Sequence, residues 1–180
     1  MVAPAGHFDG VRFIQLYHMG WDQHSDLPNQ VRSQCRDTDQ ASAALIKDLK
    51  QRGMLDDTLV IWGGEFGRTP TINKDAGRDH WPHAYTTVLA GGGVRGGQVY
   101  GSTDSRGAYV AAQPVTPADV LATLWTCLGI DPETELRDRQ NRPYVLSSGR
   151  PIKELLEEGA TVVSDASEKR GAKNASAKRR

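Results

Sequence analysis

The sequence predicts an α/β fold with a mainly parallel central sheet. Two runs of β-branched and aromatic residues, at 11–17 and 58–62, have the length and composition of buried strands. The helical pattern of residues 28–52 separates them, so the three segments form a βαβ unit, whose crossover is almost always right-handed. Each strand run is followed by a glycine-containing loop, as at the carboxyl edge of an open α/β sheet.

The first helix is predicted from residues 28–52. Within it, Ala41, Leu45 and Leu49 recur at four-residue spacing, which places them on one face of a helix. Gly53 is the expected C-terminal cap. The second strand run begins soon afterwards, so the helix forms the connection between the two strands.

A third strand is predicted at residues 85–90, followed by two short peripheral strands at 99–101 and 108–112. Two histidines directly precede the third strand, so an antiparallel or looped arrangement would return them to the edge of the sheet. The glycine-rich segment 91–97 lacks the Gly-Lys-Ser/Thr ending of a phosphate loop, and no helical pattern follows it. It therefore predicts a tight turn between strands.

Residues 116–129 carry clear start and stop signals for a second helix. Thr116 fits the N-cap, Pro117 the first helical position, and Asp119 the capping box, while Gly129 ends the helix. The predicted buried face comprises Val120, Leu121, Leu124, Trp125 and Leu128.

At 180 residues, the chain has room for one domain of ordinary size. We expect this domain to span residues 1–158, with a short final helix over 151–158, and a disordered basic tail to follow at 159–180. Six basic and no acidic residues lie in 169–180, so the other 16 basic and 22 acidic residues give the body a net charge of −6. An acidic body argues against a nucleic-acid-binding surface on the fold.

The sequence also bears on location and redox chemistry. No apolar run approaches the roughly 20 residues needed to span a bilayer, and the first residues lack the order of a secretory signal. These features predict no membrane span and a cytoplasmic location. Cys35 and Cys127 have no CxxC spacing, so they predict neither a zinc knot nor a disulfide framework. Cys127 falls in the second helical pattern and is expected in the core.

Acidic and histidine side chains gather in the glycine-flanked loops around the first three predicted strands. Carboxylate and imidazole ligands suit zinc, manganese or iron better than a thiolate site would. We therefore predict a divalent metal ion, zinc in the first place, with manganese, calcium or iron as alternatives. A purely structural, hydrogen-bonded cluster is the competing interpretation. The candidate ligands are Asp22, His24, Glu65, Asp79, His80 and His83.

Glu65 and Arg68 are the predicted catalytic residues. Glu65 is a candidate ligand or general base, and an ion pair with Arg68 is its alternative role. A guanidinium binds phosphate or sulfate oxygens bidentately, so Arg68 is the predicted clamp for an anionic substrate. Trp21 and Trp81 flank the ligand candidates. We predict that they bind substrate as walls of the site, with core packing as the alternative.

Four motifs together resemble a known family. They are GWDQH, ALIKDLKQRGMLDDTLVIWGGEFGRTP, GRDHWPHAYTTVLAGGGVRGG and VTPADVLATLWTCLGID. Over about residues 10–158 they resemble the DUF1501 family, bacterial proteins frequent in planctomycetes and placed in the alkaline phosphatase and sulfatase-like superfamily. The resemblance implies part of an alkaline phosphatase-like α/β/α sandwich with a metal-centred site that hydrolyses anionic phosphate or sulfate esters.

The resemblance also implies roles for particular residues. Asp22 resembles the aspartate ligand that follows a core strand of the superfamily. Glu65 stands where the superfamily usually has an Asp-His pair, and Phe66 replaces the histidine of that pair. One of His80 and His83 resembles the late histidine ligand that precedes a strand.

Members of the family are typically more than twice as long and resemble exported proteins, so the resemblance implies that this chain corresponds to a C-terminal portion. The expected function is a metal-dependent hydrolase-like domain that lacks the nucleophile-bearing N-terminal half. The alternatives are a non-catalytic remnant or a module that binds a partner or an anionic polysaccharide, and an iron site of two histidines and one carboxylate. The expected partners are the missing half, or a second copy joined through an open sheet edge.

Overall fold

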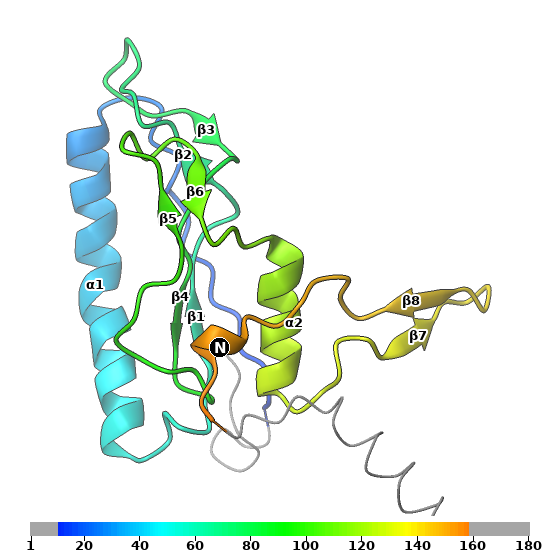
Figure 1. Cartoon of the computed structure of the whole chain (residues 1–180). Helices are drawn as coiled ribbons and strands as arrows, with labels where there is room; N and C mark the ends of the chain where they lie inside the picture. Colours follow the sequence, from blue (N-terminus) through cyan, green and yellow to red (C-terminus); the bar gives the residue numbers. More distant parts are fainter. Residues whose placement is uncertain (1–10, 159–180) are drawn as a thin grey trace, which may run out of the picture. The chain divides into compact units, whose positions relative to one another are not determined.

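The structure is a computed structural model that describes residues 11–158 and has a mixed α/β fold (Figure 1). In this part of the chain, two α-helices, one short 3-10 helix and four two-stranded sheets make up the regular structure. The chain forms two compact units. Unit 1 contains residues 11–92 and 96–114, and unit 2 contains residues 93–95 and 115–158.

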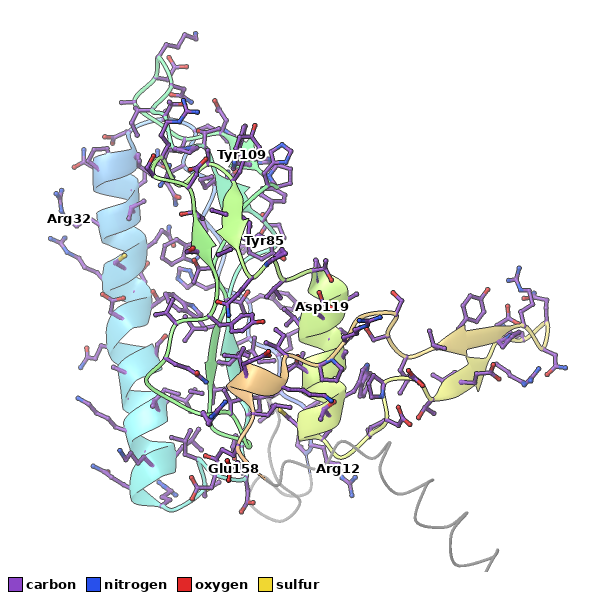
Figure 2. All side chains as sticks on the ribbon, viewed as in Figure 1. Arg12, Arg32, Tyr85, Tyr109, Asp119 and Glu158 are labelled. Atoms are coloured by element: carbon purple, nitrogen blue, oxygen red, sulfur yellow. The ribbon has the colours of Figure 1, made fainter. Side chains whose placement is uncertain are left out.

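Helix α1 (Leu27–Gln51) is the long helix of unit 1 and confirms the first predicted helix. The backbone N–H of Asp26, its N-cap, donates to the carbonyl of Asp75, which ties the start of the helix to a loop far along the chain. Gly53 follows the C-cap with a φ of 66°, as predicted for a helix stop. Leu49 is buried. Arg32 points away from the rest of the chain in Figure 2.

Strand β1 (Val60–Trp62) pairs antiparallel with β4 (Val88–Ala90), with Ile61 opposite Leu89. The second and third predicted strands are thus confirmed, and so is the antiparallel arrangement of the third. Ahead of β1, Thr58 and Leu59 are buried. They contribute with Leu49 to the core of unit 1.

The predicted parallel central sheet is wrong for residues 11–158, because every strand pair there is antiparallel. The first predicted strand, 11–17, contains a single bridge residue at Phe13 and is otherwise irregular. Its apolar side chains other than Ile14 are exposed, 77% for Leu16 and 82% for Tyr17. An extended segment becomes a strand when a neighbour pairs with its N–H and C=O groups. No named strand within residues 11–158 pairs with this segment.

Two further pairs complete unit 1. Strand β2 (Gly67–Arg68) pairs antiparallel with β3 (His80–Trp81), and residues 69–79 form the loop between them. Strand β5 (Ser102–Thr103) pairs antiparallel with β6 (Val110–Ala112), close to the predicted short strands. Gly91, Gly92 and Gly93 have φ values of 73°, 56° and 84°, which confirms the tight turn after β4.

In unit 2, α2 (Pro117–Cys127) confirms the second predicted helix. The hydroxyl of Thr116 accepts from the backbone N–H of Asp119, whose carboxylate accepts from the N–H of Thr116, so the predicted capping box is complete. Strand β7 (Glu135–Arg137) pairs antiparallel with β8 (Pro143–Val145). The predicted final helix is shorter than expected, a single 3-10 turn, η1 (Lys153–Leu155).

The buried face of α2 differs from the prediction. Ala122, Thr123 and Thr126 are buried, whereas Leu121 and Leu128 are exposed. Hydrogen bonds made by polar side chains explain this difference. Thr123 Oγ1 accepts a hydrogen bond from the backbone N–H of Ile152, and Ser147 Oγ donates to the carbonyl of Ala118, so the segment after β8 packs on the threonine side of the helix.

Other predictions concern the cysteines, the membrane and the tail. Cys35 and Cys127 are both free thiols. Cys127 is half-buried, and this burial raises the pKa of its thiol. No helix within residues 11–158 has the length and apolar character needed to cross a membrane. The predicted disordered tail, 159–180, lies outside the described residues.

Candidate metal centre

Three candidate ligands converge on one point of unit 1. Asp22 Oδ1 lies 3.0 Å from His24 Nε2 and 3.0 Å from His80 Nε2. The two histidine nitrogens are 3.2 Å apart. The three side chains are exposed, so the triangle of ligand atoms is accessible from solvent.

The spacing of these atoms fits a single metal ion. Ligand atoms held about 2.0–2.1 Å from a tetrahedral zinc ion lie about 3.3 Å from one another, and neighbouring ligands of an octahedral ion at the same distance lie about 2.9 Å apart. The edges of the triangle, 3.0–3.2 Å, fall between these two values. An ion bound by Asp22, His24 and His80 would keep coordination positions open for water or substrate.

The antiparallel pairing of β2 and β3 places two of the surrounding side chains together. Arg68 stands directly opposite His80 in the register, so both project from the same face of the ladder. Arg68 Nη1 donates to Asp22 Oδ1 at 2.6 Å, and Nη2 donates to the carbonyl of Trp21 at 2.8 Å. Arg68 thereby anchors the loop that carries Asp22.

These donors set the charge of Asp22. The hydrogen bond from His80, followed by that from Arg68, lowers the pKa of the Asp22 carboxyl to about 2. Asp22 is therefore an anionic acceptor at neutral pH, which is the form that binds a metal cation.

A second carboxylate lies behind His24. His24 Nδ1 is 3.0 Å from Asp79 Oδ1. Asn73 Nδ2 donates to the same carboxylate oxygen and to the carbonyl of His24, both at 3.0 Å. The hydrogen bond from His24, followed by that from Asn73, lowers the pKa of Asp79. Asp79 therefore contacts a candidate ligand and stands outside the triangle of ligand atoms.

The loop between β2 and β3 is bound tightly to the segment that carries His24. Asn73 Oδ1 accepts from the backbone N–H of Gly77 at 2.8 Å, and the N–H of Arg78 donates to the carbonyl of Gln23 at 2.9 Å. A Cβ on Gly77 would lie 2.0 Å from the carbonyl carbon of His24. Glycine at this position is what permits the close approach of the two chain segments.

Phe66 forms an apolar wall on one side of the triangle. Its ring centroid lies 4.5 Å from that of His80, and the guanidinium carbon of Arg68 lies 5.6 Å from the same phenyl centroid. Both contacts limit the positions that His80 and Arg68 can take.

The other predicted site residues lie apart from the triangle. Glu65 is exposed and makes no hydrogen bond or ion pair with the described residues, so its predicted ion pair with Arg68 is not formed. His83 and Trp81 belong to an aromatic cluster with Tyr109, at centroid distances of 4.7 Å between Trp81 and His83 and 5.2 Å between His83 and Tyr109. Trp21 supplies its backbone carbonyl to Arg68.

The side chains of His80 and Trp81 point to opposite faces of β3, as strand geometry requires. Neighbouring residues of a strand point to opposite faces, so the ring of Trp81 leaves the side on which His80 meets Asp22. The indole N–H of Trp81 donates to the carbonyl of Ala108 at 2.6 Å. Trp81 thus packs among aromatic rings, as in the alternative of core packing, and its predicted substrate contact stays a prediction.

Sequence reasoning missed Asn73 and Phe66. The sequence Asn73-Lys74-Asp75-Ala76-Gly77 carries a usable signal for the first, because an asparagine side chain often bonds to its own backbone a few residues on and so fixes a turn. The contact of Phe66 with His80 had no such signal, since it depends on the pairing of β2 with β3.

Comparisons with known proteins identify a family. A search of curated proteins and a search of solved structures each returned no significant match. The family model described as "Protein of unknown function (DUF1501)" matches residues 7–156, which is most of the chain and includes every candidate ligand. On this match, the chain belongs to the DUF1501 family.

Proposed function

We propose that the chain binds one divalent metal ion through Asp22, His24 and His80, as part of a domain that hydrolyses phosphate or sulfate esters. The observation that carries the proposal is the triangle of ligand atoms with edges of 3.0–3.2 Å. Hydrogen bonds alone account poorly for all three short distances, because each imidazole nitrogen carries at most one proton and the ionised carboxylate carries none. A single cation would bind all three ligand atoms at once.

The charges around the triangle support an anionic substrate. Asp22 and Asp79 are the carboxylates of the cluster, and Arg68 is its guanidinium. With neutral histidines these groups sum to one negative charge, so a divalent ion would leave a net positive site. A bound divalent ion supplies Lewis-acid polarisation of an ester oxygen and lowers the pKa of bound water.

The residues of the chain have distinct proposed roles. Asp22, His24 and His80 hold the ion, and Arg68 holds Asp22 in place. The hydrogen bonds to Asp22 and Trp21 use two of the five N–H groups of the Arg68 guanidinium, so Arg68 can hold Asp22 and also donate to an anion. Glu65 is proposed as the general base, since its exposed carboxylate lies two residues before β2, next to Phe66.

The proposal extends to a larger assembly. We infer that this chain represents a C-terminal portion of an alkaline phosphatase-like sandwich, in which an N-terminal half would add parallel strands and the nucleophile. Support comes from the apolar side chains of residues 11–19, exposed although their composition is that of a buried strand. A module that only binds a partner is the second candidate, and the same exposed segment favours it.

The proposed function is tested by the metal content of the purified chain. Elemental analysis after dialysis against zinc, manganese or iron(II) should give one ion per wild-type chain. Asp22→Ala and His80→Ala should lose it. His83→Gln is the matched control, because His83 packs against Trp81 and Tyr109 and should leave the stoichiometry unchanged.

The outcomes separate the candidates. One ion lost in both ligand variants and kept in His83→Gln supports the site and justifies assays on phosphate and sulfate esters. Preferential uptake of iron(II) would favour an iron site of two histidines and one carboxylate. No ion in a folded wild-type chain would overturn metal binding by Asp22, His24 and His80 in this chain, and would leave the binding module.

A further inference from the structure

His24 meets different partners at its two ring nitrogens. Nδ1 lies 3.0 Å from Asp79 Oδ1, and Nε2 lies 3.0 Å from Asp22 Oδ1 and 3.2 Å from His80 Nε2. Asp79 therefore lies across the imidazole ring from the point where the three ligand atoms meet.

Asp79 determines which nitrogen of His24 carries the proton. An aspartate carboxylate is ionised at neutral pH and can only accept hydrogen bonds, and Asp79 Oδ1 lies 3.0 Å from both His24 Nδ1 and Asn73 Nδ2. His24 Nδ1 is then the donor, because its 3.0 Å contact with Asp79 has hydrogen-bond geometry, whereas the equally short contact of Nε2 with Asp22 does not. In the neutral ring this leaves a lone pair on Nε2, directed at Asp22 and His80, which is the form that binds a metal.

His80 has the opposite arrangement in the metal-free chain. Its Nε2 lies 3.0 Å from the carboxylate oxygen Oδ1 of Asp22, so Nε2 is the donor when the ring is neutral. The same N–H points toward the lone pair of His24 Nε2, 3.2 Å away. His80 must transfer its proton to Nδ1 before Nε2 can bind a metal, whereas His24 needs no change.

We propose that Asp79 is a positioning residue and not a metal ligand, holding His24 as the Nδ1–H tautomer so that His24 is the pre-formed ligand of the site. Asn73 supports it by donating to both the Asp79 carboxylate and the carbonyl of His24. The inference rests on the proposed metal binding. Carboxylates behind metal-binding histidines fix the tautomer and the ring orientation in this way.

The tautomers can be measured in the full chain labelled with ¹⁵N. Long-range ¹H–¹⁵N correlation spectra at about pH 8.5, where a free imidazole is neutral, distinguish the two tautomers. His24→Gln and His80→Gln assign the signals. We expect His24 to be the Nδ1–H tautomer before and after zinc is added, and His80 to change from Nε2–H to Nδ1–H.

Variants of Asp79 test its role directly. In Asp79→Ala, His24 should no longer be confined to one tautomer, and zinc affinity should fall about 10- to 100-fold. Asp79→Asn should have a smaller effect, because the amide oxygen still accepts from Nδ1. Asp75→Asn is the matched control, since this carboxylate of the same loop pairs with Lys74 at 3.6 Å. It should change neither the tautomer nor the affinity.

Three results would overturn the inference. The first is an Nε2–H tautomer for His24 in the metal-free wild type. The second is an Asp79→Ala chain that keeps both the tautomer and the zinc affinity. The third is a change in the cobalt(II) absorption bands of Asp79→Asn, which would make Asp79 a ligand. A wild-type chain that binds neither zinc nor cobalt would overturn the proposed function, while the metal-free spectra would still decide whether Asp79 fixes the tautomer.

Discussion

At the scale of single residues, one carboxylate oxygen organises the candidate site. Asp22 Oδ1 lies within hydrogen-bond distance of a guanidinium and two imidazoles, contributed by Arg68, His24 and His80. Two of these partners lie more than forty positions along the sequence, on facing strands of one ladder. The hydrogen bonds from His80 and Arg68 hold this carboxylate in its ionised form.

The lowered pKa of Asp22 predicts a pH-dependent contribution to stability. Its value in the folded chain, about 2, lies below the ordinary 3.8. Ionised Asp22 therefore favours the folded state, and this contribution is complete above the unfolded pKa and is lost as the pH falls through about 2. In chelator, the urea midpoint of Asp22→Asn should lie below that of the wild type at about pH 5, and the gap should close steadily below about pH 4.

Urea titrations followed by circular dichroism at several pH values measure this gap. An undiminished gap at the lowest pH would contradict the prediction, because a protonated Asp22 cannot form the ionic hydrogen bonds with Arg68 and His80 that lower its pKa.

At the scale of elements, the loop at residues 69–79 determines whether the site exists. Its ends are fixed by the β2–β3 ladder, and its middle is bound to the segment before α1 through the Ser25 and Ala76 bridge. Arg78 Nε donates back to the carbonyl of Thr69 and closes the loop on itself. Local hydrogen bonds thus bring Asp79 and His80 to the loop that carries His24.

Gly77→Ala tests the close approach between this loop and His24. The added Cβ would lie 2.0 Å from the carbonyl carbon of His24 and 2.4 Å from the backbone nitrogen of Ser25, and neither atom is the end of a flexible side chain. We expect a loss of about 1–3 kcal/mol in the free energy of unfolding, together with weaker zinc binding.

Gly96→Ala is the matched control for this change. A Cβ at Gly96 meets nothing within 4 Å, so its effect should stay within about 0.5 kcal/mol. Urea unfolding of both variants gives the comparison, and equal effects of the two substitutions would show that the loop does not need the close approach at Gly77.

At the scale of the whole molecule, residues 11–19 carry apolar surface that the described chain does not cover. Leu16 and Tyr17 are 77% and 82% exposed, and Met19 is 88% exposed. The β1–β4 pair also has two strands only, so both have an edge without a named strand beside it in the described part. Exposed apolar residues next to open strand edges favour association with another chain.

We therefore expect the purified chain to associate with itself when no other partner is present. Light scattering during gel filtration should give a mass above the 19.7 kDa of one chain. The double substitution Leu16→Asp with Tyr17→Asp should return the mass toward that of one chain, because two charges oppose burial of the segment.

The control for self-association places the same two charges elsewhere. Gln40→Asp with Ser42→Asp adds them to exposed positions of α1 and should leave the larger mass unchanged. A wild-type chain that runs as a single copy at every concentration would refute the expectation.

Sequence patterns predicted the elements that depend on local signals. The period of apolar residues and the Gly53 stop located α1, and the Thr116 and Asp119 capping box located α2. Runs of β-branched residues located β1 and β4. The same kind of run failed at residues 11–17, because strand formation requires a partner as well as composition.

By itself, the sequence determined the helices, the main turn, the family and the set of residue types from which a metal site could be made. The tertiary structure alone decided which members of that set meet. The ligand atoms of Asp22, His24 and His80 lie together, whereas Asp79 contacts the other ring nitrogen of His24 and His83 packs against Trp81. The physical reason lies in strand β3, whose side chains alternate between two faces. Its register against β2 sets His80 opposite Arg68, and no short-range pattern in the sequence encodes this register.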